Sequence, residues 1–307
     1  MDRTRRLQTA SAGHDDAVEG LGVAVIGLGA VGSSLARSLY RTKYRLLALI
    51  GRTRSAAAEL AAETGTPIAS DSVGDIPHEA KLLFICTRED AIAQVVAALV
   101  ETRIRFEEAV VAHVSGWETA AILSPLAERG ARTMSFHPLG SFPPERPDKT
   151  FDGFTIGLEG DPLAVAVGRV VALDLGAQPV EIATEAKPAY HLAASATSNY
   201  LVTLMSDVQR ILASAGLPRL LTQSLAADTL LNLASMDPER ALTGPIVRGD
   251  AEALESQIRT LRVVAPELLP RFSVLAGGTI DLALTSGRLT HDQSTELRRI
   301  LEAAGAS

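Results

Sequence analysis

The 307-residue sequence lacks features that mark several large classes of protein. Its single cysteine, Cys86, excludes an intramolecular disulfide framework, and its place in the apolar run 82–86 predicts a buried core residue. No uninterrupted apolar stretch is long enough to span a membrane, and the polar first residues do not resemble a secretory signal. We therefore expect a cytoplasmic protein with no membrane partner, and a disordered N-terminal tail over residues 1–20.

The sequence also has fewer basic than acidic residues. Lysine and arginine number 29 against 36 acidic residues, giving a formal net charge of −7, and the arginines are not gathered into one run. Because phosphate backbones attract basic surfaces, we expect no nucleic-acid partner. The sequence has no internal repeat or low-complexity segment, and 47% of it is apolar, enough to bury the cores of about two domains.

The most informative feature present is an apolar run over residues 23–26 that turns through three glycines toward a helical pattern. Gly27 allows a tight turn, Gly29 lets backbone N–H groups approach a pyrophosphate, and Gly32 lets the helix pack closely on the strand. A second strand-like run, 45–50, follows at the expected distance. The pattern predicts a dinucleotide-binding turn. Its residues are Gly27, Leu28, Gly29, Ala30, Val31 and Gly32.

The end of the second predicted strand indicates which dinucleotide binds. Enzymes that use NAD usually carry an acidic residue there, which bonds the ribose 2′-hydroxyl. This sequence instead has Arg52, Thr53 and Arg54, two guanidinium groups flanking a hydroxyl, which suit a 2′-phosphate. The alternative without a function is a solvated basic turn at the start of the next helix, although arginine at a helix N-terminus interacts unfavourably with the helix macrodipole. We therefore expect NADP(H) as the cofactor.

Strand-like runs alternate with helical patterns up to about residue 180, and the rest is almost wholly helical. This predicts an α/β Rossmann fold with a doubly wound parallel sheet over 21–180, followed by an all-α C-terminal domain over 181–307 for substrate binding and dimerisation. The predicted strands are 23–27, 45–50, 67–69, 82–87, 109–113, 133–137, 154–158 and 178–182. The predicted helices are 33–40, 56–64, 91–100, 162–173, 184–215, 221–234, 251–264, 266–285 and 291–304.

Ligands of open α/β sheets bind beyond the carboxyl ends of the strands. Thr87 follows the fourth strand, where it is expected to meet the cofactor ribose, and Asp90 is available there as a helix N-cap. Ser115 follows the fifth strand and is a candidate for the nicotinamide side of the pocket. His113 and His137 end the fifth and sixth strands, where an imidazole is either an acid/base group or a loop anchor. We take His137 as a substrate-binding candidate.

The predicted helix 184–215 carries a polar strip. At 3.6 residues per turn, Lys187, His191 and Ser195 advance by about 40° per step, and Asn199 lies near the edge of the strip. Such a strip faces water or lines a pocket. Hydride transfer to a carbonyl creates an alkoxide that needs a proton donor, and a Lys or His held against an apolar wall can supply the proton. We take these four residues as catalytic candidates, with Lys187 as the first choice of acid and His191 as the second.

Residues 243–250, where glycine and proline impose turns, are predicted to line the site opposite the polar strip. These turns would bring together Thr243 and Arg248, which are the remaining substrate-binding candidates. Arg248 is expected either to bind a substrate carboxylate through a bidentate hydrogen bond or to form an ion pair with Asp250 or another acid. Asp250 is as plausible an N-cap as a catalytic group. We expect no metal ion.

Four segments together resemble a family of Rossmann-like oxidoreductases whose helical domain long lacked an assigned function, related to ketopantoate reductase and 6-phosphogluconate dehydrogenase. They are Val114-Ser-Gly, Ser135-Phe-His-Pro-Leu-Gly-Ser-Phe142, Lys187-Pro-Ala-Tyr-His-Leu-Ala-Ala with Ser198-Asn-Tyr, and Ala241-Leu-Thr-Gly-Pro-Ile-Val-Arg-Gly-Asp250. The resemblance implies NADPH and a homodimer built through helices. Ketopantoate reductases carry a lysine and two asparagines at the places of Lys187, His191 and Ser195, so the lysine matches and the asparagines do not.

These observations predict an NADPH-dependent reductase that transfers hydride to a small, ketopantoate-like keto acid. An alternative is an imino-acid or imine reductase of the pyrroline-5-carboxylate reductase type. Its substrate is already cationic and needs less proton donation, so an essential Lys187 would argue against it. A further alternative is a non-catalytic NADPH-binding sensor, against which the polar strip counts because a sensor needs no proton donor.

Overall fold

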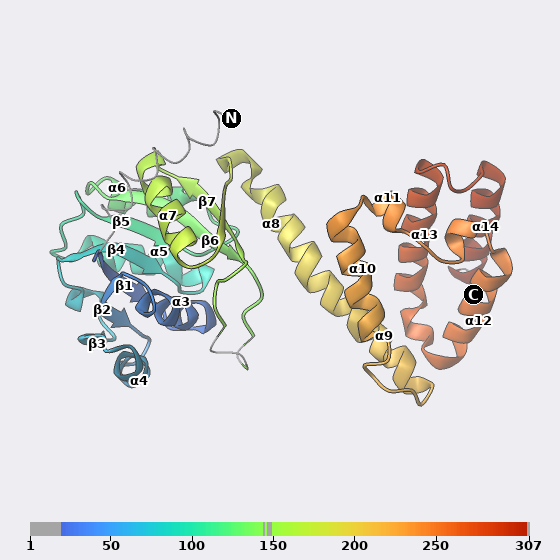
Figure 1. Cartoon of the computed structure of the whole chain (residues 1–307), viewed down its shortest axis with the longest axis horizontal. Helices are drawn as coiled ribbons and strands as arrows, with labels where there is room; N and C mark the ends of the chain where they lie inside the picture. The colour runs from blue at the N-terminus through green and yellow to red at the C-terminus, as the bar shows by residue number, and fades with distance from the viewer. Residues whose placement is uncertain (1–19, 144, 146–148, 306–307) are drawn as a thin grey trace, which may run out of the picture. The chain divides into compact units, whose positions relative to one another are not determined.

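The computed structural model describes residues 20–143, 145 and 149–305, and the chain divides into two compact units (Figure 1). The first unit ends at Ala196 and the second begins at Thr197. Residues 181–196, which the sequence analysis assigned to the helical domain, are therefore part of the unit that holds the sheet. The expected N-terminal tail lies outside the described residues, except for Gly20.

The first unit is built on an eight-stranded sheet in the order β3-β2-β1-β4-β5-β6-β7-β8. The strands are β1 (Gly22–Ile26), β2 (Arg45–Ile50), β3 (Ile68–Ser70), β4 (Ala80–Ile85), β5 (Val110–His113), β6 (Arg132–Leu139), β7 (Thr155–Gly160) and β8 (Gln178–Glu181). The first six have the Rossmann order, with the topological switch point between β1 and β4. The predicted doubly wound α/β fold is confirmed.

The sheet departs from the predicted parallel arrangement at one place, because β7 pairs with β6 in the antiparallel direction while the other neighbours are parallel. Parallel neighbours need a crossover, usually a helix, whereas antiparallel strands can be joined directly. The described part of the 140–154 connection contains no helix, so the chain returns beside β6 and reverses direction.

Helices pack on the sheet so that both of its faces are buried. They are α3 (Ala30–Tyr40), α4 (Arg54–Thr64), α5 (Glu89–Val100), α6 (Ser124–Ala127) and α7 (Pro162–Asp174). In β1, Val23 and Val25 belong to one apolar cluster, and Ala24 and Ile26 to the other, because successive side chains of a strand point to opposite faces. Cys86 is buried in the first cluster, as predicted, and burial raises the pKa of its thiol.

The predicted continuous helix over 184–215 changes its type along its length. A short 3-10 turn precedes α8 (Lys187–Ser195), a π-helical turn covers Ala196–Tyr200, and α9 (Leu201–Ser214) follows. The wider π turn advances by more residues than an α turn, so Asn199 leaves the line of the polar strip. Residues 184–214 are helical throughout, as predicted, and only the changes of helix type within them were not predicted.

The second unit consists of helices. They are α9, α10 (Gln223–Ser235), α11 (Pro238–Ala241), α12 (Ala251–Val264), α13 (Leu269–Thr285) and α14 (His291–Gly305). Asp250 caps α12 by accepting the Ala253 N–H at 3.0 Å, and Thr290 and Gln293 form a capping box before α14. None of the helices in the described part of the chain is long and apolar enough to cross a membrane.

Candidate active site at the carboxyl edge of the sheet

The glycine turn after β1 has the shape that the sequence predicted. Gly27 has φ +91°, and a Cβ on Gly32 would lie 1.9 Å from the Gly27 carbonyl oxygen, so both positions need glycine for folding. Gly29 differs, because a Cβ there would meet nothing within 4 Å. Gly29 is also the N-cap of α3, and no side chain caps this helix. The turn therefore leaves open space and exposed N–H groups at the start of α3, as a phosphate site requires.

The basic turn after β2 divides its residues between two tasks. Thr53 caps α4, since its hydroxyl accepts the Ala56 N–H at 3.4 Å. Arg54 lies 4.0 Å from Asp75, and both side chains are exposed. Arg52 is exposed and makes no hydrogen bond or ion pair with a described residue. Arg52 is thus the cation of this turn that is available to an anion.

Thr87 and Ser115 follow β4 and β5, and their hydroxyl groups are used differently. The Thr87 Oγ1 is buried without a hydrogen-bond partner among the described residues. Such an orphaned atom suits a site for a polar ligand. The Ser115 hydroxyl instead donates to Glu89 and accepts the N–H groups of Trp117 and Glu118 at 3.1 and 3.0 Å. Ser115 therefore shapes its own loop with its side chain.

The start of α5 differs from the expectation that Asp90 would be its N-cap. Arg88 occupies the N-cap position, and no side chain caps the helix. Asp90 pairs with the Arg88 guanidinium instead. The preceding residue, Glu89, is the one that reaches Ser115. Helix α5 begins at Glu89, one residue before Asp90, so the Asp90 carboxylate is better placed for the Arg88 guanidinium than for a backbone N–H.

Lys187 is the buried cation of this edge of the sheet. Its side chain is 3% exposed, and its ammonium group donates to the Ser135 hydroxyl and lies 3.5 Å from the Ser115 carbonyl oxygen. The Glu159 carboxylate is 4.0 Å away. Burial lowers the pKa of Lys187 to about 8, and the nearby Glu159 opposes that shift. The first choice of proton donor is therefore a desolvated ammonium group whose proton is held less tightly than usual.

Glu159 is itself held in place from two sides. It pairs across the sheet with Ser135, and its two carboxylate oxygens accept the Ala120 N–H at 2.8 Å and the Thr184 hydroxyl at 2.9 Å. The Glu159 side chain is only 5% exposed, so water cannot supply its hydrogen bonds. These two protein donors satisfy the buried carboxylate instead. The sequence analysis missed Glu159. Its only local sign is an acidic residue within an apolar strand.

Two imidazoles lie close to Lys187. The Nδ1 of His137 is 2.7 Å from the Tyr190 hydroxyl, and the rings of His137 and His191 have centroids 6.5 Å apart. Gly116 permits this arrangement, since a Cβ there would lie 2.7 Å from atoms of both imidazoles. Trp117 packs edge-on against His191 with ring centroids 6.0 Å apart. His137 and His191, which are predicted site residues, are thus brought together with Lys187 in the first unit.

Burial also decides the charge of this cluster. Burial lowers the pKa of His137 to about 4, and the positive charge of Lys187 adds to this shift. Burial raises the pKa of Tyr190 to about 12. Both groups are therefore neutral at neutral pH. Tyr190 was not among the candidates from the sequence, although it lies one helical turn after Lys187.

His113 is a loop anchor. It is completely buried, its Nδ1 accepts the Ser115 N–H at 3.2 Å, and its Nε2 lies 3.1 Å from the Thr119 carbonyl oxygen, to which it donates. Burial lowers its pKa to about 4. Of the two alternatives left open for this strand-end histidine, the structure gives the loop anchor.

The remaining candidates are Ser195, Asn199, Thr243 and Arg248. Ser195 is partly exposed, and its side chain makes no hydrogen bond with a described residue. Asn199 is exposed and belongs to the second unit, as do Thr243 and Arg248. Thr243 lines a cavity there, but Arg248 does not. Arg248 is exposed and forms no ion pair with a described acid.

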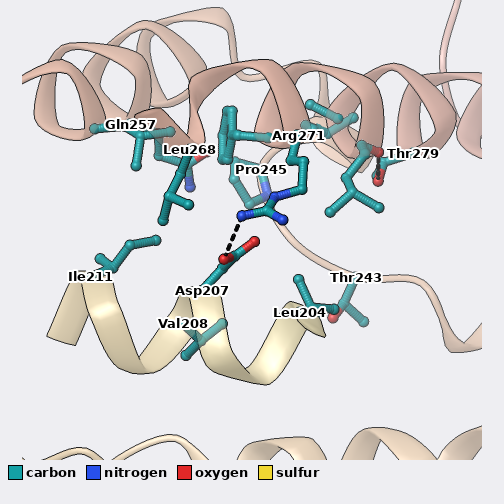
Figure 2. A pocket seen from close by; sticks show the side chains of 15 residues that line it. Leu204, Asp207, Val208, Ile211, Thr243, Pro245, Gln257, Leu268, Arg271 and Thr279 are labelled. Atoms are coloured by element: carbon teal, nitrogen blue, oxygen red, sulfur yellow. Dashed lines mark hydrogen bonds and ion pairs between the residues drawn. The ribbon is translucent and has the colours of Figure 1, made fainter. Parts of the chain in front are cut away.

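The cavity of the second unit has a volume of about 510 Å³ and lies between α9 and the helices α12 and α13 (Figure 2). Its wall is mostly apolar. Figure 2 shows Asp207 of α9 pointing toward Arg271 of α13, and the two are joined by an ion pair of 2.9 Å. This pair leaves the cavity without an uncompensated charge.

Two family models match parts of the chain, and the second match crosses the boundary between the two compact units. Residues 8–138 match the model of a Rossmann-like domain, and residues 154–279 match a domain of unknown function, DUF2520. No curated protein sequence matches significantly.

Solved structures resemble almost the whole chain. BF3122 from Bacteroides fragilis, described provisionally as an NADP oxidoreductase, is 23% identical with a TM-score of 0.72, covering 85% of this chain and 98% of its own. TM1727 from Thermotoga maritima is 24% identical with a TM-score of 0.61, covering 92% and 98%. A reductive aminase from Aspergillus terreus, solved with NADPH and ethyl levulinate, is 19% identical with a TM-score of 0.64, covering 91% and 99%. At these identities the similarity establishes a shared fold.

Proposed function

We propose that this protein is an NADPH-dependent reductase that transfers hydride to the carbonyl carbon of a small keto acid of the ketopantoate type. The observation that carries the proposal is a dinucleotide turn and a buried ammonium group at the same edge of one sheet. Ile26, the last residue of β1, is joined through successive strand pairs to Ile85, His113 and Ser135, the last of which bonds Lys187. Three strand spacings, roughly 14 Å, separate β1 from β6.

The residues present fit NADPH. The open space at Gly29 admits a pyrophosphate, the unpartnered Thr87 hydroxyl suits a ribose, and Arg52 is available for the 2′-phosphate. When bound, NADPH supplies the hydride. The reductive aminase with the same fold is solved with NADPH, which supports this choice of cofactor.

We assign the proton donor to Lys187, with His191 as the second candidate. A pKa of about 8 leaves Lys187 mostly protonated at neutral pH while making its proton easier to transfer than that of an ordinary lysine. Its contact with the Ser115 carbonyl oxygen, at 3.5 Å, is at the outer limit of a hydrogen bond. We propose that a substrate oxygen takes the place of this weak acceptor.

An imine reductase is the second candidate function. A reductive aminase shares the fold across 91% of this chain, which favours a C=N substrate as much as the Lys187 network favours a C=O substrate. The two differ in the need for an acid, because an iminium carbon accepts hydride without further protonation.

The experiment that tests these functions follows NADPH oxidation at neutral pH with ketopantoate, other small keto acids and cyclic imines, comparing the wild type with Lys187→Met and repeating with NADH. Keto-acid turnover that prefers NADPH and falls at least about a hundredfold in Lys187→Met supports the proposal. Reduction of imines alone, insensitive to Lys187→Met, supports the second candidate. Tight NADPH binding without turnover of any compound leaves a cofactor sensor and overturns both.

We also propose that the protein is a homodimer built through its second unit. Helix α10 buries none of its residues, and four of its leucines, Leu225, Leu230, Leu231 and Leu233, are exposed. Each leucine buried in an interface contributes about 1.5–3 kcal/mol, so a second copy covering α10 is favoured. Sedimentation of the wild type beside Leu225→Glu/Leu231→Glu tests this: a wild-type monomer would contradict it.

A further inference from the structure

We propose that Tyr190 is a positioning residue that fixes the tautomers of both His137 and His191, so that His191 carries its proton on Nε2. The catalytic consequence rests on the proposed function, but the arrangement of protons does not. Tyr190 and His137 are 53 positions apart in the chain and are joined by a hydrogen bond, and the ring of His191 lies beside that of His137 in the first unit.

Tyr190 and His137 share one hydrogen bond. The phenol oxygen is 2.7 Å from Nδ1 of His137 and bonds no other described residue. If His137 donated this bond, the phenolic hydrogen would be left without an acceptor in a half-buried place. Tyr190 therefore donates, the Nδ1 of His137 is a bare acceptor, and the single proton of the neutral ring is on Nε2. Gly157 makes room, since a Cβ there would lie 2.6 Å from the Tyr190 hydroxyl oxygen.

The imidazoles of His137 and His191 meet beside Gly116. Nε2 of His137 and Nδ1 of His191 each lie 2.7 Å from the point that a Cβ of residue 116 would occupy, so these two nitrogens approach the same place. The Nδ1 of His191 is buried and has no hydrogen-bond partner among the described residues. Two N–H groups facing one another would repel, whereas a lone pair on His191 Nδ1 is attracted by the His137 Nε2–H. The neutral ring of His191 therefore has its proton on Nε2.

The Nε2 atom of His191 is the ring nitrogen that faces away from His137 in this arrangement of protons. His191 is partly exposed, only its Nδ1 is among the buried unpartnered atoms, and its Nε2 bonds no described residue. The ring is held on one side by Trp117. Tyr190 thus donates to His137, the Nε2–H of His137 faces the lone pair of His191 Nδ1 without a hydrogen bond, and the Nε2–H of His191 has no acceptor among the described residues. The outward N–H fits a ligand oxygen that accepts a hydrogen bond, such as a carbonyl or carboxylate oxygen of the substrate.

The test is nitrogen NMR of protein labelled with ¹⁵N-histidine, which distinguishes protonated from bare ring nitrogens. The chain has six histidines, so the spectrum is simple, and His137→Gln and His191→Gln assign the two rings. We expect a bare Nδ1 and a protonated Nε2 in both rings of the wild type. In Tyr190→Phe, which removes only the donor, both rings should become mixtures of tautomers. Tyr40→Phe, at an exposed tyrosine of α3, is the matched control and should change neither ring.

A wild-type spectrum with protonated Nδ1 in His137, or unchanged rings in Tyr190→Phe, would overturn the inference. Kinetics then separate it from the proposed function. If Tyr190→Phe alters the tautomers but no carbonyl compound is reduced by the wild type, the positioning role stands and the reductase assignment fails. If carbonyl reduction is observed, we expect Tyr190→Phe to lower kcat/KM about tenfold without changing the Kd of NADPH.

Discussion

The carboxylate of Glu159 lies 4.0 Å from the ammonium group of Lys187, and the two side chains are 5% and 3% exposed. Removing one member of a buried ion pair leaves the other uncompensated, so the pair acts as a unit. The partners of Glu159, the Ala120 N–H and the Thr184 hydroxyl, keep its negative charge in place.

The variant Glu159→Gln should move the pH profile of the reaction. An opposite charge this close raises the pKa of an amine by about 1–3 units, so its loss should lower the pKa of Lys187 by a similar amount. If protonated Lys187 is the acid, the alkaline limb of kcat shifts to lower pH in Glu159→Gln. Glu181→Gln, at an exposed position of β8, is the control. An alkaline limb that stays in place would exclude Glu159 from this role.

The pH dependence of stability should report Lys187 independently of activity. Its pKa is lowered from 10.5 in the unfolded chain to about 8 in the folded protein, so between these values the unfolded state binds more protons. Stability from this group therefore rises as pH increases from about 8 to 10.5. Between about pH 8 and pH 10.5, the free energy of unfolding of the wild type should therefore increase relative to that of Lys187→Met. Lys81→Met, at a surface ion pair, should show no such gain.

Two glycines of the same turn should respond differently to alanine. Gly29→Ala places a methyl group in open space at φ −73°, so the change in unfolding free energy should stay below about 1 kcal/mol while the Kd of NADPH rises at least about tenfold. Gly32→Ala should unfold the first unit, because its Cβ would meet the Gly27 carbonyl oxygen. Calorimetry and NADPH titration measure both. Gly277→Ala, also in open space, is the control; unchanged NADPH binding in Gly29→Ala would contradict the proposed phosphate site.

Arg52 should separate NADPH from NADH. A charge-assisted hydrogen bond contributes about 1.5–3 kcal/mol, so Arg52→Ala should raise the Kd of NADPH by roughly tenfold or more and leave that of NADH unchanged. Fluorescence titration with both cofactors measures this. Arg105→Ala, at an exposed arginine before β5, should alter neither value. Equal losses for both cofactors would place the contact of Arg52 somewhere other than the 2′-phosphate.

The sequence by itself determined the sheet, the glycine turn and the buried cysteine. These are local properties: a strand buried on both faces reads as an apolar run, and a turn that packs against backbone needs glycine.

Only the tertiary structure decided which side chains act together. Lys187 bonds Ser135 across 52 residues of sequence, and Tyr190 bonds His137 across 53. These pairs depend on strand register, on the antiparallel return of β7 that sets Glu159 opposite Ser135, and on the room left by Gly116 and Gly157. Periodicity along the chain records which face of an element a residue occupies. Periodicity does not indicate which distant element packs against that face. The contact with that distant element determines the charge, the tautomer and the partner of each group.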